Sequence, residues 1–120
     1  MESYRELKVW EQAMNLAVAC YETTKTFPRE ELFGMASQIR RSASSIPANI
    51  AEGWGRQSTG DYIKFLRVAQ GSLKELETHL ILSHRVGLLD ADTIQKLDSR
   101  TTEIGKMLAA LIRSVQQKQP

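Results

Sequence analysis

Residues 62–80 read YIKFLRVAQGSLKELETHL, and apolar residues recur along this stretch at alternating steps of four and three. The positions that follow this period are Tyr62, Leu66, Ala69, Leu73, Leu76 and Leu80. Such a spacing is typical of a helix that packs lengthwise against other helices at a shallow crossing angle. The stretch therefore predicts one long helix with a single buried stripe.

Three further segments carry the same spacing. Their apolar stripes are Val9, Ala13, Leu16 and Cys20; Ile39, Ala43, Ile46 and Ile50; and Leu97, Thr101, Ile104, Leu108, Leu111 and Val115. Together the four stripes predict four helices, at approximately residues 6–26, 30–53, 59–85 and 91–116.

Residues that end or begin helices fall between the first three stripes. Pro28 ends one helix and suits the first turn of the next. Gly53-Trp54-Gly55 closes the second predicted helix. The sequence Ser58-Thr59-Gly60-Asp61 has the form of a capping box, in which a hydroxyl and a carboxylate satisfy free backbone N–H groups. The third helix is therefore expected to begin here.

The last connection is equally short. Gly87 suits the C-terminal cap of the third helix, and Asp90 or Asp92 can cap the fourth. Connections of this length make neighbouring helices run antiparallel. The expected fold is all-α, an antiparallel up-down-up-down four-helix bundle formed by a single domain over residues 1–120.

Composition and cysteine usage indicate the cell compartment. Cys20 is the one cysteine, and it falls in an apolar stripe, so we expect a buried small hydrophobe rather than a nucleophile or a disulfide partner. No apolar run approaches the length that spans a bilayer, and residues 1–8 lack the apolar core of a signal peptide. We expect a cytoplasmic protein that does not contact membranes.

Positive charge is concentrated in the middle of the chain. The net charge of the whole chain is +2, but residues 35–74 hold six basic and two acidic residues, a net charge of +4. The basic residues are Arg40, Arg41, Arg56, Lys64, Arg67 and Lys74. These six are the candidate nucleic-acid-binding residues.

Three of these basic residues share one side of a helix. Lys64, Arg67 and Lys74, with Gly71 between them, form a stripe opposite the apolar one, and Gly71 would let a nucleic-acid backbone approach closely. A solvated face is the alternative interpretation, because the sequence has no row of exposed aromatic residues on which bases could stack.

A second stripe on the predicted second helix is polar and mostly uncharged. It consists of Gln38, Ser42, Ser45, Asn49 and Glu52, and the third helix offers a matching stripe of Val68, Ser72, Glu75 and His79. Such a stripe suits packing against a partner that can form hydrogen bonds, or it is a polar flank inside one bundle. The candidate interface residues are Gln38, Ser45, Asn49, Glu52, Ser72 and Glu75.

Several apolar residues lie outside the four stripes. They are Trp10, Met14 and Val18 in the first helix, and Ile63, Val68, Ile81 and Leu82 in the third. One bundle of this size cannot easily cover all of them. Surplus apolar surface at helical spacing indicates protein–protein contact, so we expect self-assembly.

No arrangement of residues predicts catalysis or a cofactor. A di-iron bundle needs paired Glu-x-x-His motifs on two helices, and the nearest approach is Glu75 with His79 four residues on, which predicts a single hydrogen bond. The sequence has no Gly-x-Ser-x-Gly elbow and no phosphate-binding loop. We therefore expect no enzyme activity, no metal and no cofactor.

Three segments resemble one known family. Residues 4–10 (YRELKVW), 27–31 (FPREE) and 71–77 (GSLKELE) are similar to the proteins encoded within 23S rRNA intervening sequences. The strongest similarity is residues 38–53, QIRRSASSIPANIAEG, in which Arg40, Arg41, Asn49 and Glu52 are motif positions.

The resemblance implies an antiparallel four-helix bundle that assembles as a homopentamer. The family includes accessory variability proteins of retroelements, which bind nucleic acid and a reverse transcriptase. The leading hypothesis is thus a non-catalytic oligomeric accessory protein that contacts structured RNA or an RNA–DNA hybrid through backbone charge. The alternative is a homo-oligomeric scaffold that binds protein partners only, with the arginines in salt bridges between subunits.

Overall fold

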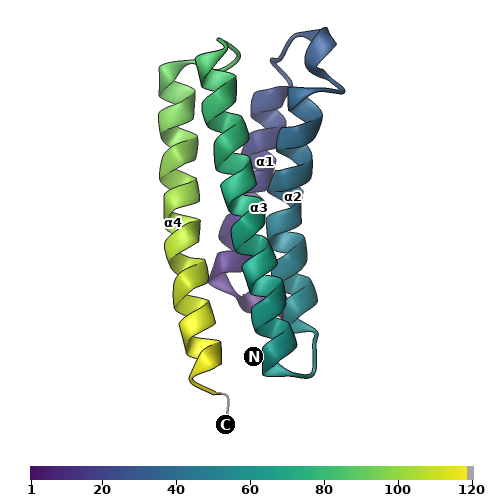
Figure 1. Cartoon of the computed structure of the whole chain (residues 1–120), viewed down its shortest axis with the longest axis vertical. Coiled ribbons are helices and arrows are strands. Elements are labelled where there is room, and N and C mark those ends of the chain that lie inside the picture. The colour runs from purple at the N-terminus through teal and green to yellow at the C-terminus, as the bar shows by residue number, and fades with distance from the viewer. Residues whose placement is uncertain (119–120) are drawn as a thin grey trace.

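The computed structural model describes residues 1–118 and is built from α-helices joined by short connections (Figure 1). The α-helices are α1 (Lys8–Thr24), α2 (Met35–Trp54), α3 (Thr59–Arg85) and α4 (Ala91–Gln116), and the short 3-10 helices are η1 (Tyr4–Glu6) and η2 (Arg29–Glu31). The all-α four-helix fold predicted from the sequence is confirmed. Residues 119–120 of the predicted domain lie outside the described part of the chain.

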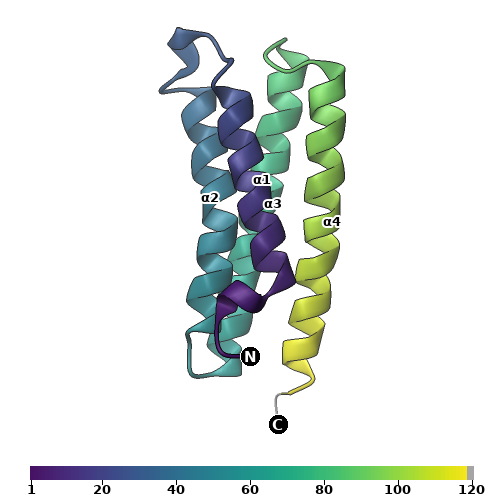
Figure 2. The same ribbon diagram turned by 180° about the vertical axis from the view of Figure 1, so that it is seen from behind.

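Consecutive helices run in opposite directions and pack side by side along a molecule of 50 × 23 × 20 Å (Figures 1 and 2). α1 and α3 each pack against both α2 and α4, so they lie at diagonal corners of the bundle. The face between α1 and α2 is therefore opposite the face between α3 and α4. The N-terminal segment with η1 packs against α1 and α2. None of the helices of residues 1–118 contains an apolar stretch of membrane-spanning length.

The four predicted apolar stripes form the core. Ile39, Ala43, Ile46 and Ile50 of α2 are fully buried, as are Leu66, Ala69 and Leu76 of α3. The stripe of α4 was incomplete, because Ile112 is buried in the core as well, whereas the predicted Leu111 is half-buried and packs against the core. These two residues lie on either side of the stripe on a 3.6-residue wheel, so the neighbouring helix, and not the period, decides which is covered.

The starts of α1 and α2 also differ from the prediction. The helix predicted from residue 6 begins at Lys8, because η1 comes first and Leu7 has extended backbone (φ −72°, ψ 122°). The helix predicted from residue 30 begins at Met35, because Gly34 has a non-helical conformation (φ −106°, ψ −113°). The Glu31 carboxylate accepts a hydrogen bond from the Met35 N–H at 3.2 Å, which satisfies one free donor of the new helix.

The predicted N-caps of α3 and α4 are present, with the Ser58 hydroxyl forming its half of the expected capping box. Ser58 Oγ accepts a hydrogen bond from the Asp61 N–H at 3.1 Å, and Asp90 Oδ1 accepts one from the Thr93 N–H at 2.8 Å. Gly87 has φ of +85°, a left-handed conformation that side chains disfavour. These local signals fix α3 and α4 at the predicted boundaries.

Candidate functional site

The basic stripe of α3 borders a groove between α3 and α4, which we call the α3–α4 groove. The groove has a volume of about 710 Å³. Arg67 and Lys74 line it from α3, and Lys106 lines it from α4. Lys64 lies exposed on the same stripe of α3, beyond the residues that line the groove. Three cations from two helices and one carboxylate, that of Glu77, therefore line one hollow, which keeps a net positive charge.

Two glycines keep the groove open. A Cβ added at Gly71 would meet no atom within 4 Å, so this part of α3 faces free space. A Cβ at Gly105 of α4 would lie 3.5 Å from Leu73 Cδ2, an ordinary contact distance. Since neither glycine presents a side chain, a ligand can come close to the backbone of both helices.

The cations of the groove are held only weakly by the protein. Lys74 Nζ lies 3.2 Å from Glu77 Oε1, and its side chain is 77% exposed. Arg67 Nη1 donates a long hydrogen bond of 3.4 Å to Gln70 Oε1. Ion pairs in contact with water contribute between zero and about 1 kcal/mol, so a phosphate can replace these partners at little cost.

Sequence reasoning missed Lys106. The C-terminal part of the chain, residues 75–120, has no net charge, so nothing drew attention to α4. Thr102, Lys106 and Ala109 follow a spacing of four and three, which places them on one side of α4. This spacing, together with the expectation that the fourth helix packs antiparallel to the third, could have identified Lys106 from the sequence.

Three of the six candidate basic residues lie elsewhere, in separate places. Arg40 Nε donates to Thr24 Oγ1 at 2.8 Å, and its guanidinium carbon lies 5.0 Å from the centre of the Tyr21 ring. Arg56 pairs with Glu52 at 2.9 Å and lies 4.7 Å from the centre of the Phe65 ring. Both arginines contact other residues of the chain, away from the α3–α4 groove. The six candidate basic residues therefore do not form one continuous surface.

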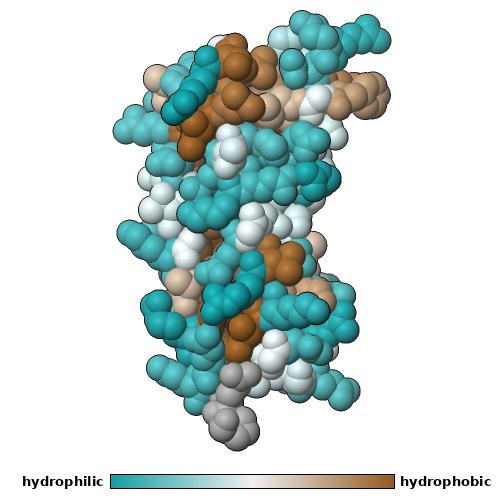
Figure 3. Space-filling view, in the orientation of Figure 1, coloured by the Kyte–Doolittle hydropathy of each residue, from teal (hydrophilic) through white to brown (hydrophobic). Residues whose placement is uncertain are grey.

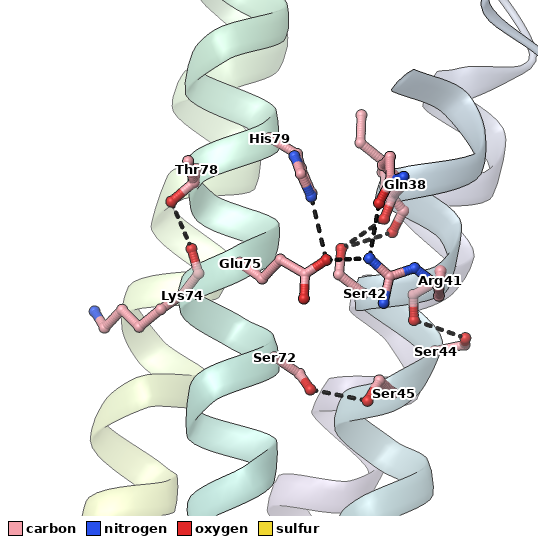
Figure 4. Close-up of polar contacts among 11 residues, drawn as sticks. Gln38, Arg41, Ser42, Ser44, Ser45, Ser72, Lys74, Glu75, Thr78 and His79 are labelled. Carbon is pink, nitrogen blue, oxygen red and sulfur yellow. Dashed lines mark hydrogen bonds and ion pairs between the residues drawn. The ribbon is translucent and has the colours of Figure 1, made fainter. Parts of the chain in front are cut away.

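Arg41 belongs to a polar network between α2 and α3 (Figure 4). Its Nη2 donates to Glu75 Oε2 and, at 2.7 Å, to Gln38 Oε1. The same Glu75 oxygen lies 3.2 Å from His79 Nε2, which is the predicted contact between these two residues. Glu75 thus joins the two helices across their outer edge.

The polar stripe continues along the same edge. Ser45 Oγ and Ser72 Oγ lie 2.8 Å apart, and Asn49 Nδ2 donates to the Ser45 carbonyl at 2.8 Å. Ser42 is buried and donates to the Gln38 carbonyl at 2.9 Å. These contacts favour the interpretation of the stripe as a polar flank inside one bundle, since its members satisfy one another within the chain.

Residues 1–118 contain no group of three or more His, Cys, Asp or Glu side chains that could hold a metal ion. Burial raises the pKa of the Cys20 thiol to about 12, so the reactive thiolate is scarce at neutral pH. Cys20 is therefore a core residue, as its place in the stripe predicted.

Known proteins resemble this chain in sequence and fold. No curated protein matches it. The crystal structure of a protein of unknown function from the S23 ribosomal protein family of Bacteroides thetaiotaomicron matches with a TM-score of 0.78 and 31% identity, over 87% of this chain and 97% of that chain. The family model of the 23S rRNA-intervening sequence protein matches residues 5–110. Because that match spans most of the sequence and the fold agrees, the chain belongs to the 23S rRNA-intervening sequence protein family.

Proposed function

We propose that this protein is a non-catalytic, self-assembling accessory protein that binds a nucleic-acid backbone in the α3–α4 groove. The observation that carries the proposal is the placement of Arg67, Lys74 and Lys106 around a groove with open glycine positions. Each cation that meets a phosphate releases condensed counterions, and this release supplies most of the affinity of non-specific binding.

The groove suits backbone contacts better than base contacts. No aromatic side chain of the described residues lines it, so it offers no platform on which bases could stack. Hydrophilic side chains form a band across the molecular face formed by α2, α3 and α4, with apolar patches above and below it (Figure 3). The ligand class is therefore structured RNA or an RNA–DNA hybrid, held by charge and without sequence-specific readout.

Self-assembly would strengthen such binding. Met14, Val18, Val68, Ile81 and Leu82 were expected to exceed what one bundle covers, and each is between 38% and 58% exposed. Trp10 and Ile63 differ, because they pack against the core. Several grooves in one assembly would bind one nucleic acid with increased avidity. The pentamer and the reverse-transcriptase partner implied by the family resemblance remain predictions.

Fluorescence anisotropy with a labelled RNA hairpin, measured over a series of salt concentrations, tests the proposal. Arg67→Glu and Lys106→Glu should each weaken binding and make its dependence on salt shallower by about one unit of slope on a log–log plot. Lys8→Glu is the matched control, because Lys8 is exposed on α1, diagonally opposite α3, and the charge change is the same.

Equal losses in all three variants would show that only the total charge matters and would reject the groove. Unchanged binding in the two groove variants would reject it as well. Circular dichroism should show the same helix content in each variant, since all three side chains are exposed.

A scaffold that binds protein partners only is the second candidate. Arg40, Arg41 and Arg56 have partners within the chain, which leaves them less available to a nucleic acid. The same partners argue against the salt bridges between subunits that this alternative was expected to use. Such a scaffold would self-assemble but would not bind the RNA hairpin even at low salt, so the same titration separates the two functions.

A further inference from the structure

One aromatic side chain has no partner in the bundle. Phe33 lies in the segment between η2 and α2 and is 92% exposed, and its neighbour Leu32 is 45% exposed. Apolar residues also gather at the upper end of the molecule in Figure 3, where this segment and the end of α3 lie. A fully exposed phenylalanine on a short projecting segment leaves a large apolar surface in water, which indicates contact with another molecule.

A groove that could receive such a side chain lies on another face of the same chain. This α1–α2 groove has a volume of about 640 Å³. Its lining is largely apolar and includes Trp10, Met14, Val18, Tyr21 and Pro47. Hollows of roughly 300–1,000 Å³ hold a drug-sized molecule, so this groove has room for Phe33 together with Leu32 of a second chain.

We propose that Phe33 of one copy of this protein docks into the α1–α2 groove of the next copy. This inference deepens the self-assembly of the proposed function and does not depend on nucleic-acid binding. The projecting residue and the groove are separate surfaces of one chain, so the contact is heterologous. Each copy then offers one free knob and one free groove, and the contact repeats until a ring closes.

Charge at the two surfaces is complementary. Arg5 and Arg40 lie over the rings of Tyr4 and Tyr21, two residues that line the α1–α2 groove, each at 5.0 Å from the ring centre. Lys25 and Glu22 line the groove as well and pair with each other at 3.1 Å. The charges of the lining residues Lys25 and Glu22 balance, so Arg5 and Arg40 give the rim of the groove its positive charge.

The segment that presents Phe33 has the opposite balance. It carries Glu30 and Glu31 against Arg29. Two apolar side chains bury less than the roughly 800 Å² per partner of a stable interface, so polar contacts around them must supply the remainder. An acidic segment that meets a basic rim supplies contacts of the right sign.

The test uses two variants that each remove one half of the contact. Phe33→Ser removes the knob, and Val18→Glu places a charge in the groove, at a residue that is 58% exposed. Size-exclusion chromatography with light scattering should show a monomer for each variant alone and a closed oligomer for the unmodified chain. Ala110→Glu is the matched control, because Ala110 is exposed on α4 and belongs to neither the Phe33 segment nor the lining of the α1–α2 groove.

Mixing the two variants gives the decisive result. The Val18→Glu chain keeps its knob and the Phe33→Ser chain keeps its groove, so an equimolar mixture contains one functional contact. A one-to-one heterodimer that does not grow further is expected.

A mixture that stays monomeric would overturn the proposal, as would an unmodified chain that is itself monomeric. Assembly that survives either variant, or that the Ala110→Glu change also disrupts, would overturn it equally. No RNA is present in this assay, so its failure would leave the nucleic-acid proposal untouched.

Discussion

Gly53, in the last turn of α2, lies directly against Phe65 of α3, so that a Cβ at position 53 would stand 2.8 Å from the Phe65 Cβ. The same Cβ would lie 3.1 Å from Tyr62 Cδ1 and 3.2 Å from the Tyr62 carbonyl oxygen. The end of α2 and the start of α3 can approach this closely only because residue 53 has no side chain. The motif glycine therefore has a packing role.

Replacing Gly53 by alanine should destabilise the protein. The added methyl group would push α2 and α3 apart, and overpacking of this kind typically costs about 1–3 kcal/mol. The free energy of unfolding, measured by urea denaturation, should fall by this cost less the stabilisation that alanine gives a helix. The penalty should exceed the gain of roughly 1 kcal/mol that alanine brings to a helix in place of glycine.

Gly71→Ala is the matched control, because its Cβ would meet no atom within 4 Å. Gly71 lies inside α3, so this substitution should raise the free energy of unfolding by roughly 0.5–1 kcal/mol. Equal effects at positions 53 and 71 would show that the close contact at Gly53 does not constrain packing.

The hydrophobic period and the cap residues were sufficient to predict most of the fold. Ser58 and Asp90 cap α3 and α4 through their own side chains, so the sequence gives these boundaries directly. The start of α2 could not be predicted in this way. It depends on the backbone of Gly34 and on the Glu31 side chain, and neither has the form of an ordinary N-cap.

The candidate site was predictable only in part. The stripe of Arg67 and Lys74 follows from helical spacing, whereas Lys106 required knowledge of which helix lies beside α3. Arg40 and Arg41 are adjacent in sequence, yet one contacts Thr24 of α1 and the other Glu75 of α3. Net charge along the sequence cannot separate such residues, because side chains one position apart on a helix point about 100° away from each other.

Replacing Ser83 by alanine should stabilise the protein. The Ser83 side chain is fully buried, and its hydroxyl has no hydrogen-bond partner within the described part of the chain. A buried polar group without a partner costs about 1–3 kcal/mol, and alanine also favours the helix. Chemical denaturation of Ser83→Ala should show an increase of about 1 kcal/mol in the free energy of unfolding.

Ser42→Ala is the comparison for this prediction. Ser42 is as deeply buried, but its hydroxyl donates to the Gln38 carbonyl at 2.9 Å, so its removal also loses a hydrogen bond. Ser42→Ala should therefore gain nothing. A loss of stability in Ser83→Ala would show that its hydroxyl is satisfied in solution.

Asp90 should make α4 sensitive to acid. Hydrogen bonding from the Thr93 N–H holds the pKa of the Asp90 carboxyl below its ordinary value of 3.8. Because the pKa is lower in the folded state than in the unfolded state, the carboxylate stabilises the fold above pH 3.8, and this contribution is lost as the pH falls through the folded pKa. Thermal melting of Asp90→Ala should show a reduced Tm at neutral pH.

The difference in Tm between the unmodified chain and Asp90→Ala should shrink in strong acid, where the Asp90 carboxyl is protonated in both states. Asp90→Asn serves as the control, since an asparagine side chain also accepts the cap hydrogen bond without titrating. A difference in Tm that stays constant with pH would contradict the role of the ionised carboxylate.

Cys20 should react with thiol reagents only when the protein unfolds. Its side chain is fully buried in α1, and burial raises the pKa of the thiol from 9.0 to about 12, an effect that Arg100 partly offsets. Labelling by a disulfide reagent at mildly alkaline pH should be slow in the native protein and fast in denaturant.

Because the pKa of the Cys20 thiol is higher in the folded state than in the unfolded state, the thiol also lowers the free energy of unfolding as the pH rises from 9 towards 12. Cys20→Ala should weaken this alkaline loss of stability. Rapid labelling of the native protein would show that the C-terminal part of α1 opens far more readily than its core packing implies.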